Sequence, residues 1–341
     1  MVKVGIIGLG GMGNMHLGVY QSLPKSEAEV VAIADIDPAK LKPGESSQEI
    51  NIGAGAGALD RDRMNLCESA DELIADPNVD LVDITLPTFL HADCAVKALR
   101  AGKHVLCEKP MAMNGAECDR MLAAQRESGK ALMIAQCLRF WPEYAYLKEL
   151  VDSGRLGRLT GGHFWRGSTA PDWAWDNWLL DAKRSGGAIL DLHVHDVDTV
   201  NYLLGVPKAV FSTGSIGVSG GYDIVDTVYV YGDANMSIHA GANWTLPKGF
   251  QFEMRYAASF ENGCLTYSST HSPTLIETSG EEAIRSEVAD STGYAEEIPY
   301  FLRCLETGAE PTMCPPASSA DSVRIAVAEM ESARTGKLVE V

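Results

Sequence analysis

The sequence predicts a two-domain protein of the α/β class. Up to about residue 137, short runs rich in Val and Ile alternate with longer segments of helical periodicity, which is the pattern of parallel βαβ units. After about residue 138, consecutive strands joined by short turns containing Gly, Asp or Asn replace this alternation. We therefore expect a doubly wound parallel sheet in residues 1–137 and an α+β domain with a mixed, mostly antiparallel sheet in residues 138–341.

The first domain is expected to alternate strands with crossover helices. The strands are predicted over 2–7, 29–35, 64–67, 79–86, 103–107 and 131–135, and the helices over 11–22, 70–76, 90–101 and 114–128. Residues 42–60 fit neither pattern, because a polar stretch is followed by one rich in Gly and Ala, and we expect an inserted surface loop there. The Gly-Ala repeat at 53–58 follows no convincing strand, so we interpret it as part of that loop.

The second domain is expected to begin with helices and continue as a sheet. Helices are predicted over 140–152 and 187–204 with Trp-rich loops between them, strands over 207–217, 223–232, 235–244, 250–257 and 260–267, and helices over 294–306 and 317–335. The last helix has the position in the chain from which it can pack back on the first domain.

Charge and cysteine usage exclude several classes of function. The formal net charge is −18, which repels phosphate backbones and anionic lipid surfaces, so we expect no nucleic-acid or membrane partner. The 8 cysteines contain no CxxC pair and no zinc spacing. The N-terminal apolar run is too short for an export signal, and we expect a cytoplasmic protein.

Residues 8–13, GLGGMG, form a GxGxxG motif that follows a predicted strand and opens a predicted helix. Gly8 permits the tight turn, Gly10 lets the backbone approach a pyrophosphate, and Gly13 lets helix and strand pack closely. Gly11 and Met12 lie at the start of the helix, whose N–H groups bind an anion. The loop predicts a dinucleotide cofactor.

Asp35 lies 22 residues past Gly13, at the end of the second predicted strand. A carboxylate there accepts hydrogen bonds from both ribose hydroxyls and repels a 2′-phosphate, which favours NAD over NADP. The alternative is a helix N-cap, but Asp37, followed by Pro38, fits that role better.

Glu108, Lys109 and Pro110 follow the strand at 103–107 and so emerge at a carboxyl strand end, where open α/β sheets bind ligands. A lysine at this point can donate a hydrogen bond to a substrate oxygen. A solvated lysine beside a glutamate explains the tripeptide equally well.

Residues 186–198, GGAILDLHVHDVD, hold the densest cluster of ionisable side chains. Asp191 and His195 are four residues apart, which puts both on one face of a helix. Imidazole suits the removal of a hydroxyl proton, and a nearby carboxylate orients it. Two alternatives remain: a capped helix with a structural histidine, and a metal site that uses Asp191, His193, His195 or Asp198. We assign no metal ligand.

Five of the six tryptophans lie between residues 141 and 178. Together with polar neighbours they can form a wall that stacks on the C–H face of a polyol. Core packing or a subunit contact explains single tryptophans equally well. The substrate-binding candidates beside Lys109, Asp191 and His195 are Arg139, Trp141, His163, Trp165 and Trp173.

Several motifs carry a resemblance to a known family. They are GLGGMG at 8–13, the strand end at Asp35, LPTFLHAD at 86–93, CEKPMA at 107–112, RFWPEY at 139–144, GGAILDLHVHDVD at 186–198 and the closing AVAEMESARTGKLVEV. Over nearly its whole length, the chain resembles the family of glucose–fructose oxidoreductase and inositol 2-dehydrogenase.

The resemblance implies a Rossmann domain followed by an open-faced sheet domain, with a dimer or tetramer formed through that sheet. It implies that Lys109 lies by substrate and nicotinamide, with a cis bond before Pro110, and that Asp191 and His195 complete the catalytic set. It also implies a place in the cofactor site for Pro87, His91 and Glu108, together with Lys109.

We therefore expect an NAD-dependent dehydrogenase that acts on a secondary hydroxyl of a sugar, inositol or related polyol. His193 departs from the small residue that many members carry there, and the loop at 42–60 is longer than usual. The family also contains non-enzymes and NAD-dependent glycosidases, so the alternatives are an NAD-binding sensor or scaffold and an NAD-dependent glycosidase.

Overall fold

The computed structural model describes residues 1–42, 59, 63–233 and 235–341. The Gly-Ala repeat at 53–58 and nearly all of the loop expected at 42–60 lie outside these residues. The chain divides into two compact units, residues 1–137 with 293–320 and residues 138–292 with 321–341. Each unit is built around its own sheet.

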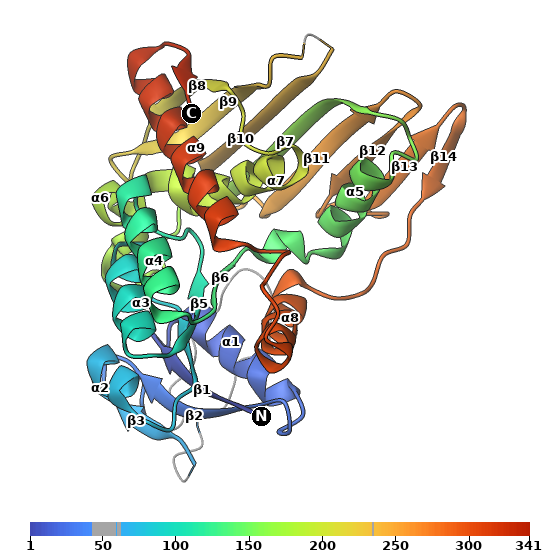
Figure 1. The fold of residues 1–341 in the computed structure, drawn as a ribbon. Coiled ribbons are helices and arrows are strands. Elements are labelled where there is room, and N and C mark those ends of the chain that lie inside the picture. Colours follow the sequence, from blue (N-terminus) through green and yellow to red (C-terminus); the bar gives the residue numbers. More distant parts are fainter. Residues whose placement is uncertain (43–58, 60–62, 234) are drawn as a thin grey trace. The chain divides into compact units, whose positions relative to one another are not determined.

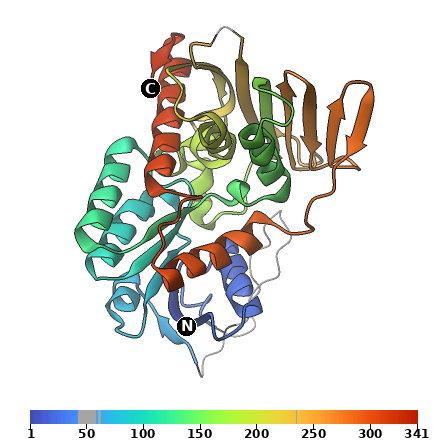
Figure 2. The same ribbon diagram turned by 45° about the vertical axis from the view of Figure 1, so that its right-hand side comes forward.

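The first unit contains a parallel sheet of six strands in the order β3-β2-β1-β4-β5-β6. The strands are β1 (Val2–Ile7), β2 (Ala28–Ala34), β3 (Asn65–Cys67), β4 (Leu81–Ile84), β5 (His104–Glu108) and β6 (Leu132–Ala135). The helices are α1 (Gly11–Ser22), α2 (Ala70–Ala75), α3 (His91–Arg100), α4 (Gly115–Ser128) and α8 (Gly293–Thr307). Helices α1 and α8 lie together on one face and α2, α3 and α4 on the other (Figures 1 and 2).

Burial on both faces explains the composition of these strands. All four residues of β4 and of β6 are buried, as expected for parallel strands that helices cover on both sides. Helix α8 belongs to this unit, although the sequence pattern places it in the second domain. It packs on α1 and buries Ile298 and Phe301, so the last part of the chain completes the first core.

The second unit is built on a sheet of nine strands in the order β14-β13-β12-β11-β7-β10-β9-β8-β15. These are β7 (Leu159–Thr169), β8 (Ala209–Ile216), β9 (Tyr222–Val230), β10 (Ser237–Leu246), β11 (Glu253–Phe260), β12 (Gly263–Ser268), β13 (Leu275–Ser279), β14 (Glu282–Arg285) and β15 (Val339–Glu340). Strands β7 and β10 pair in parallel, and the other neighbours pair antiparallel. The expected mixed, mostly antiparallel sheet is confirmed.

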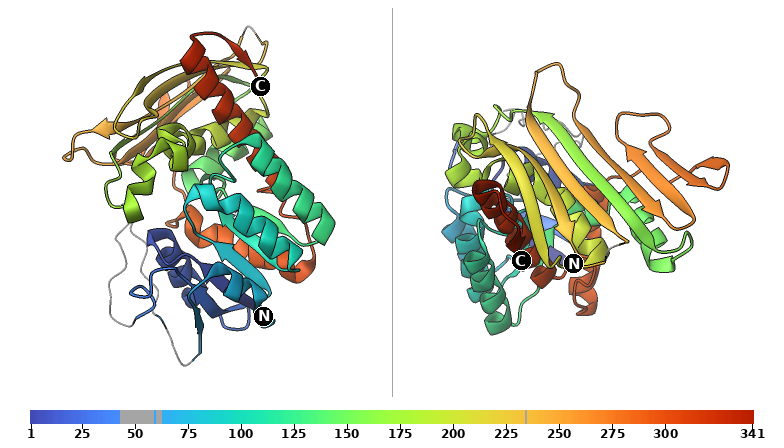
Figure 3. Two further views of the ribbon diagram at one scale, coloured as in Figure 1. Left: turned by 90° about the vertical axis from the view of Figure 1, so that its left-hand side faces the viewer. Right: turned by 90° about the horizontal axis from the view of Figure 1, so that it is seen from above.

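One face of this sheet carries the helices of the unit, and the other is open (Figure 3). The helices are α5 (Pro142–Ser153), the short α6 (Ala182–Ser185), α7 (Val194–Leu204) and α9 (Pro316–Thr335), of which residues 316–320 group with the first unit. Along β11 buried and exposed residues alternate, with Met254 and Tyr256 inward and Arg255 and Ala257 outward. This alternation is typical of a sheet with one covered face.

The sequence pattern missed four strands, β7, β13, β14 and β15. Residues 159–169 were expected to be a Trp-rich loop, and this prediction is wrong. Three glycines, Gly161, Gly162 and Gly167, hide the hydrophobic alternation of β7, and tertiary pairing with β10 and β11 overrides their low strand propensity.

No helix within the described ranges has the length and hydropathy that a bilayer crossing requires.

Candidate functional site

The glycine-rich loop joins the end of β1 to the start of α1. Gly8 has a φ of +98°, and a Cβ at this residue would lie 2.8 Å from the carbonyl oxygen of Thr85. A Cβ at Gly13 would lie 2.0 Å from the carbonyl oxygen of Gly8, so only glycine lets the first turn of α1 pack on the loop. At Gly10 no atom of the residues that the structure describes lies within 4 Å of the Cβ position, which suits a close backbone approach by a pyrophosphate.

Asp35 stands at the end of β2 beside this loop. Its Oδ2 accepts a hydrogen bond of 2.7 Å from the backbone N–H of Leu9, and its Oδ1 accepts one of 2.9 Å from the N–H of Asp37. The Nζ of Lys40 lies 3.4 Å from Oδ2. Asp37 itself accepts from the N–H of Ala39 at 3.0 Å, which caps a turn. Asp35 therefore holds a fixed negative charge next to the glycine-rich loop.

His91 connects two loops at the carboxyl edge of the parallel sheet. Its Nε2 lies 2.7 Å from the carbonyl oxygen of Leu86, and its Nδ1 lies 2.8 Å from that of Pro110. The side chain is 1% exposed. His91 thus holds the half-buried Pro87 and the Lys109–Pro110 peptide in place, and its ring nitrogens are engaged by backbone oxygens. That peptide bond is cis, as the resemblance implies.

Lys109 is half-buried at the end of β5, and its backbone N–H donates to Glu108 Oε2 at 3.0 Å. The Glu108 carboxylate is turned into the unit, where its Oε1 lies 3.1 Å from Nε2 of His16. Glu108 is 4% exposed. Its carboxylate, expected in the cofactor site, therefore faces His16 in the interior of the unit.

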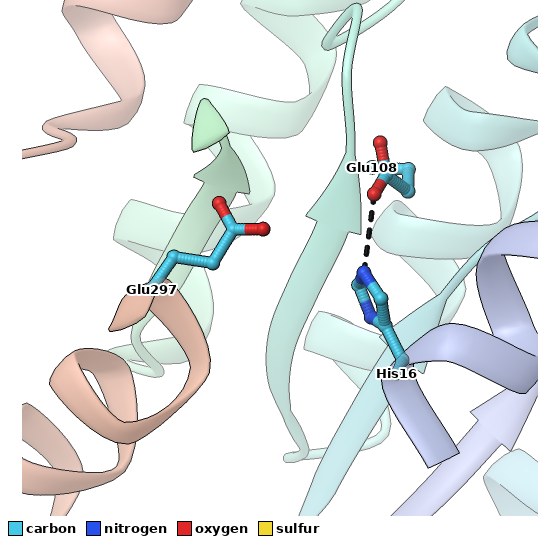
Figure 4. A group of neighbouring side chains, drawn as sticks. All are labelled: His16, Glu108 and Glu297. Carbon is cyan, nitrogen blue, oxygen red and sulfur yellow. Dashed lines mark hydrogen bonds and ion pairs between the residues drawn. The ribbon is translucent and has the colours of Figure 1, made fainter. Parts of the chain in front are cut away.

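His16 is a buried residue that the sequence reasoning missed. Its Nδ1 lies 2.8 Å from Oδ2 of Asp83. Glu297 of α8 faces His16 and Glu108, and one possible ligand atom from each of the three lies within 4.8 Å of the others (Figure 4). Burial by itself lowers the pKa of His16, but the carboxylates of Asp83 and Glu108 outweigh it and raise that pKa well above its usual value.

The segment predicted as one helix over 187–204 starts with a wide π turn, Ile189–His193, and continues as α7. Such turns are frequent at functional sites. Asp191 and His195, four residues apart, are both half-exposed. The other ionisable side chains of the segment, His193, Asp196 and Asp198, are buried.

Each buried member of the segment lies against an ionisable partner. His193 Nε2 lies 3.0 Å from Oε2 of Glu329, and Asp196 pairs with Arg166 at 3.1 Å. Asp198 binds Arg139 through two hydrogen bonds of 2.8 and 2.7 Å. His193 and Asp198 are therefore engaged elsewhere, and the ligand set considered for a metal here does not converge. Arg139, predicted to bind substrate, is 2% exposed and holds α7 instead.

The residues of the tryptophan-rich region do not share one surface. His163 and Trp165 alternate along β7 with Phe164 and Arg166. Arg166 reaches Asp196 on the covered face, so His163 and Trp165 point from the open face, where His163 stacks on His239 and Arg255 lies 4.4 Å over the Trp165 ring. The structure does not bring these two residues together with Asp191 and His195.

Trp141 is buried at 9% exposure, while Trp173 is 40% exposed. Lys109, Asp35 and the glycine-rich loop belong to the first unit, and Asp191, His195 and all the tryptophan candidates to the second. The predicted site residues are thus divided between the two units.

Comparison with known proteins agrees with this division. Residues 2–136 match the family model described as "Oxidoreductase family, NAD-binding Rossmann fold". Residues 144–266 match the one described as "GFO/IDH/MocA C-terminal domain".

Named relatives cover the chain to different extents. Levoglucosan dehydrogenase of Pseudarthrobacter phenanthrenivorans is 31% identical over 239 residues, which is 67% of this chain and 59% of the relative. Myo-inositol 2-dehydrogenase of Thermotoga maritima is 26% identical over 363 aligned positions, covering 100% of this chain and 99% of the relative. The chain spans less than two thirds of the length of the first curated relatives it matches.

Among solved structures, a levoglucosan dehydrogenase in complex with NADH and levoglucosan has a TM-score of 0.83 at 22% identity, covering 100% of this chain and 99% of the other. This likeness confirms the fold of both units. Since the two family models together account for most of the sequence, the chain belongs to the GFO/IDH/MocA oxidoreductase family.

Proposed function

We propose that the chain is an NAD-dependent dehydrogenase that transfers hydride between the nicotinamide and a secondary hydroxyl or ketone of a sugar, inositol or related polyol. The observation that carries this proposal is the burial of ionisable side chains in residues 189–204. His193, Asp196 and Asp198 are buried against ionisable partners, whereas Asp191 and His195 stay half-exposed. A buried scaffold thus presents one carboxylate and one imidazole.

The first unit fits the cofactor. The glycine-rich loop leaves room for a pyrophosphate at Gly10, and Asp35 offers a carboxylate to a ribose. When bound, NAD supplies a hydride acceptor. In the proposed reaction the substrate carbon loses a hydride and the hydroxyl loses a proton, so an alcohol becomes a ketone.

His195 is proposed to take the hydroxyl proton, and Asp191 to orient its imidazole. Lys109 is proposed to stabilise the charge that develops on the reacting oxygen. The names of the relatives support the substrate class, because levoglucosan and inositol both carry secondary hydroxyls.

The decisive experiment incubates the purified protein with NAD and a panel of sugars, inositols and other polyols, and follows NADH absorbance. We expect NADH formation with at least one panel member. A sensor or scaffold would bind NAD without turnover, and a glycosidase would release a sugar from a glycoside without net NADH. Either of these results contradicts the dehydrogenase proposal.

Cofactor preference is expected to depend on Asp35. Asp35→Ser removes the charge that opposes a 2′-phosphate and leaves Lys40 facing the same position. We expect the preference for NAD over NADP to fall by about tenfold or more, because like-charge contacts cost several kcal/mol. Titration of both cofactors by protein fluorescence measures it, with Asp37→Ser as the neighbouring control. Unchanged preference in Asp35→Ser would show that another group selects the cofactor.

We also propose a homodimer or homotetramer formed through the open face of the nine-stranded sheet. Support comes from the side chains on that face, where Trp165 lies beneath Arg255 and Phe211 is 39% exposed. His163 and Trp165 would then contact a second copy and not the substrate. Sedimentation velocity of the wild type gives the assembly state.

A cytoplasmic location is supported by the eight cysteines, which are thiols and not disulfides.

A further inference from the structure

The interior of the first unit holds four ionisable side chains from four different elements. His16 comes from α1, Asp83 from β4, Glu108 from β5 and Glu297 from α8. His16, Asp83 and Glu297 are 0% exposed and Glu108 is 4% exposed. The proposed reaction uses none of their side chains.

Negative charge is in excess in this cluster. Three carboxyl groups face one imidazole. Burial, followed by the charges of Glu108 and Asp83, raises the pKa of Glu297 well above its usual value, and among the described residues the one positive group that opposes this is His16. A buried carboxylate is costly unless a positive partner compensates it. The single imidazole cannot compensate all three.

Glu297 is the residue that lacks a partner. Its two carboxylate oxygens are buried and make no hydrogen bond to any part of the chain that the structure describes. Figure 4 shows the carboxylate directed from α8 toward His16 and Glu108. A fully buried acceptor with two unused oxygens, aimed at two other acceptor-bearing groups, points to a cation between them.

The donor atoms have the spacing of a metal site. One atom each from His16, Glu108 and Glu297 lie within 4.8 Å of one another. First-row divalent cations bind such nitrogen and oxygen atoms at about 2.0–2.2 Å, which requires ligand atoms a few Å apart.

Asp83 supplies the outer partner of such a site. Its Oδ2 lies 2.8 Å from Nδ1 of His16, so Nδ1–H can donate to it and leave Nε2 directed at Glu108 and Glu297. A metal-binding histidine usually donates its second N–H to a carboxylate in this way. Cation binding would displace the proton that His16 and Glu108 share at 3.1 Å.

We propose that His16 Nε2, Glu108 and Glu297 bind one divalent first-row transition-metal or zinc ion, with Asp83 as the outer partner of His16. The ion ties α1, β5 and α8 together, and its role is structural because the site is buried. One imidazole with two carboxylates suits Zn²⁺ or Mn²⁺, whereas Ca²⁺ takes six to eight oxygen ligands. All four residues belong to the first unit, and the proposed ion takes no part in the proposed dehydrogenase reaction.

The test measures metal content and thermal unfolding of the full-length protein. After treatment with chelator, the protein is titrated with Zn²⁺ and, separately, Mn²⁺ and Ca²⁺. We expect one bound ion per chain, tighter binding of Zn²⁺ than of Mn²⁺, no effect of Ca²⁺, and an unfolding midpoint that rises with metal concentration. Co²⁺ in the same site is expected to give visible bands without thiolate charge transfer, which excludes binding to the cysteines.

Three variants sharpen the test. Glu297→Gln keeps the shape of the side chain and is expected to lose the bound ion and the midpoint rise. Glu296→Gln, on the exposed side of α8, is the matched control and is expected to keep both. Asp83→Asn is expected to weaken metal affinity by about 10–100-fold.

Two results would overturn the proposal: a wild type that binds no Zn²⁺ or Mn²⁺ after chelator treatment, or a Glu297→Gln protein that binds them as the wild type does. A Glu297→Gln protein that unfolds at a higher temperature than the wild type whether or not metal is added would also contradict it, because Glu297 then carries a proton in place of a metal bond. If Glu297→Gln fails to fold, the metal content of the wild type and the affinity of Asp83→Asn decide the question.

Discussion

Replacing His195 by Asn is expected to lower the turnover of alcohol oxidation by about 10²–10⁴-fold, the range that a positioned general base contributes. Asparagine keeps hydrogen-bonding capacity but cannot accept the hydroxyl proton at neutral pH. NAD affinity is expected to stay nearly unchanged, because the glycine-rich loop and Asp35 belong to the other unit of the chain.

The measurement pairs steady-state kinetics on the substrate found in the panel with fluorescence titration of NAD. His271→Asn is the matched control, since His271 is an exposed histidine of the same unit. It is expected to keep wild-type turnover. Full activity in His195→Asn would remove His195 from the mechanism.

The pH dependence separates the roles of Lys109 and His195, both of which can relay the proton. The wild-type oxidation rate is expected to rise with pH as the base loses its proton. Whichever variant, His195→Asn or Lys109→Ala, loses that rise identifies the base. Lys109→Ala is expected to lower turnover to a similar extent, because a charge beside the developing oxyanion acts mainly on the transition state.

The second large effect concerns stability. Arg139→Met is expected to lower the free energy of unfolding by about 3–5 kcal/mol, because it leaves the carboxylate of Asp198 buried without its positive partner. Both side chains of this pair are 1% exposed. Ser322 still donates to Asp198 at 2.8 Å, but a neutral hydroxyl does not replace the guanidinium.

Urea unfolding of the purified variants measures this loss. Arg158→Met is the control, since Arg158 pairs with Asp233 at the surface, where exposed pairs contribute about 0–1 kcal/mol. The double variant Arg139→Met with Asp198→Leu is expected to recover part of the loss, because it removes the orphaned charge. A loss in Arg139→Met no larger than in Arg158→Met would show that Arg139 does not stabilise α7.

Local patterns predicted most of the first unit. Strand β1 and helix α1 have the predicted bounds, because the apolar run before Gly8 and the helix after Gly10 are both signalled within a few residues. In contrast, β7 depends on its neighbours β10 and β11 for pairing, and its glycines carry no strand signal of their own.

Candidate site residues could be predicted where their side chains lie close together in the sequence. Asp191 and His195 stand in one short segment, so their spacing shows in the sequence. Arg139 is predicted to bind substrate because its positive charge lies near tryptophans in the sequence. Only the fold shows that its guanidinium binds Asp198, which lies 59 residues away. His16 and Glu297 come from opposite ends of the chain, and no local pattern connects them.

The assignment of α8 to the first unit has a consequence for synthesis on the ribosome. The parallel sheet is complete in sequence at residue 137, but the helix that covers α1 starts only at Gly293. At about 5–20 residues per second, the nascent first unit waits on the order of ten seconds or more for that helix. During this interval the surface of α1 against which α8 packs, through buried residues such as Ile298 and Phe301, stays uncovered. The growing chain therefore exposes, for these seconds, an apolar surface that the finished protein covers.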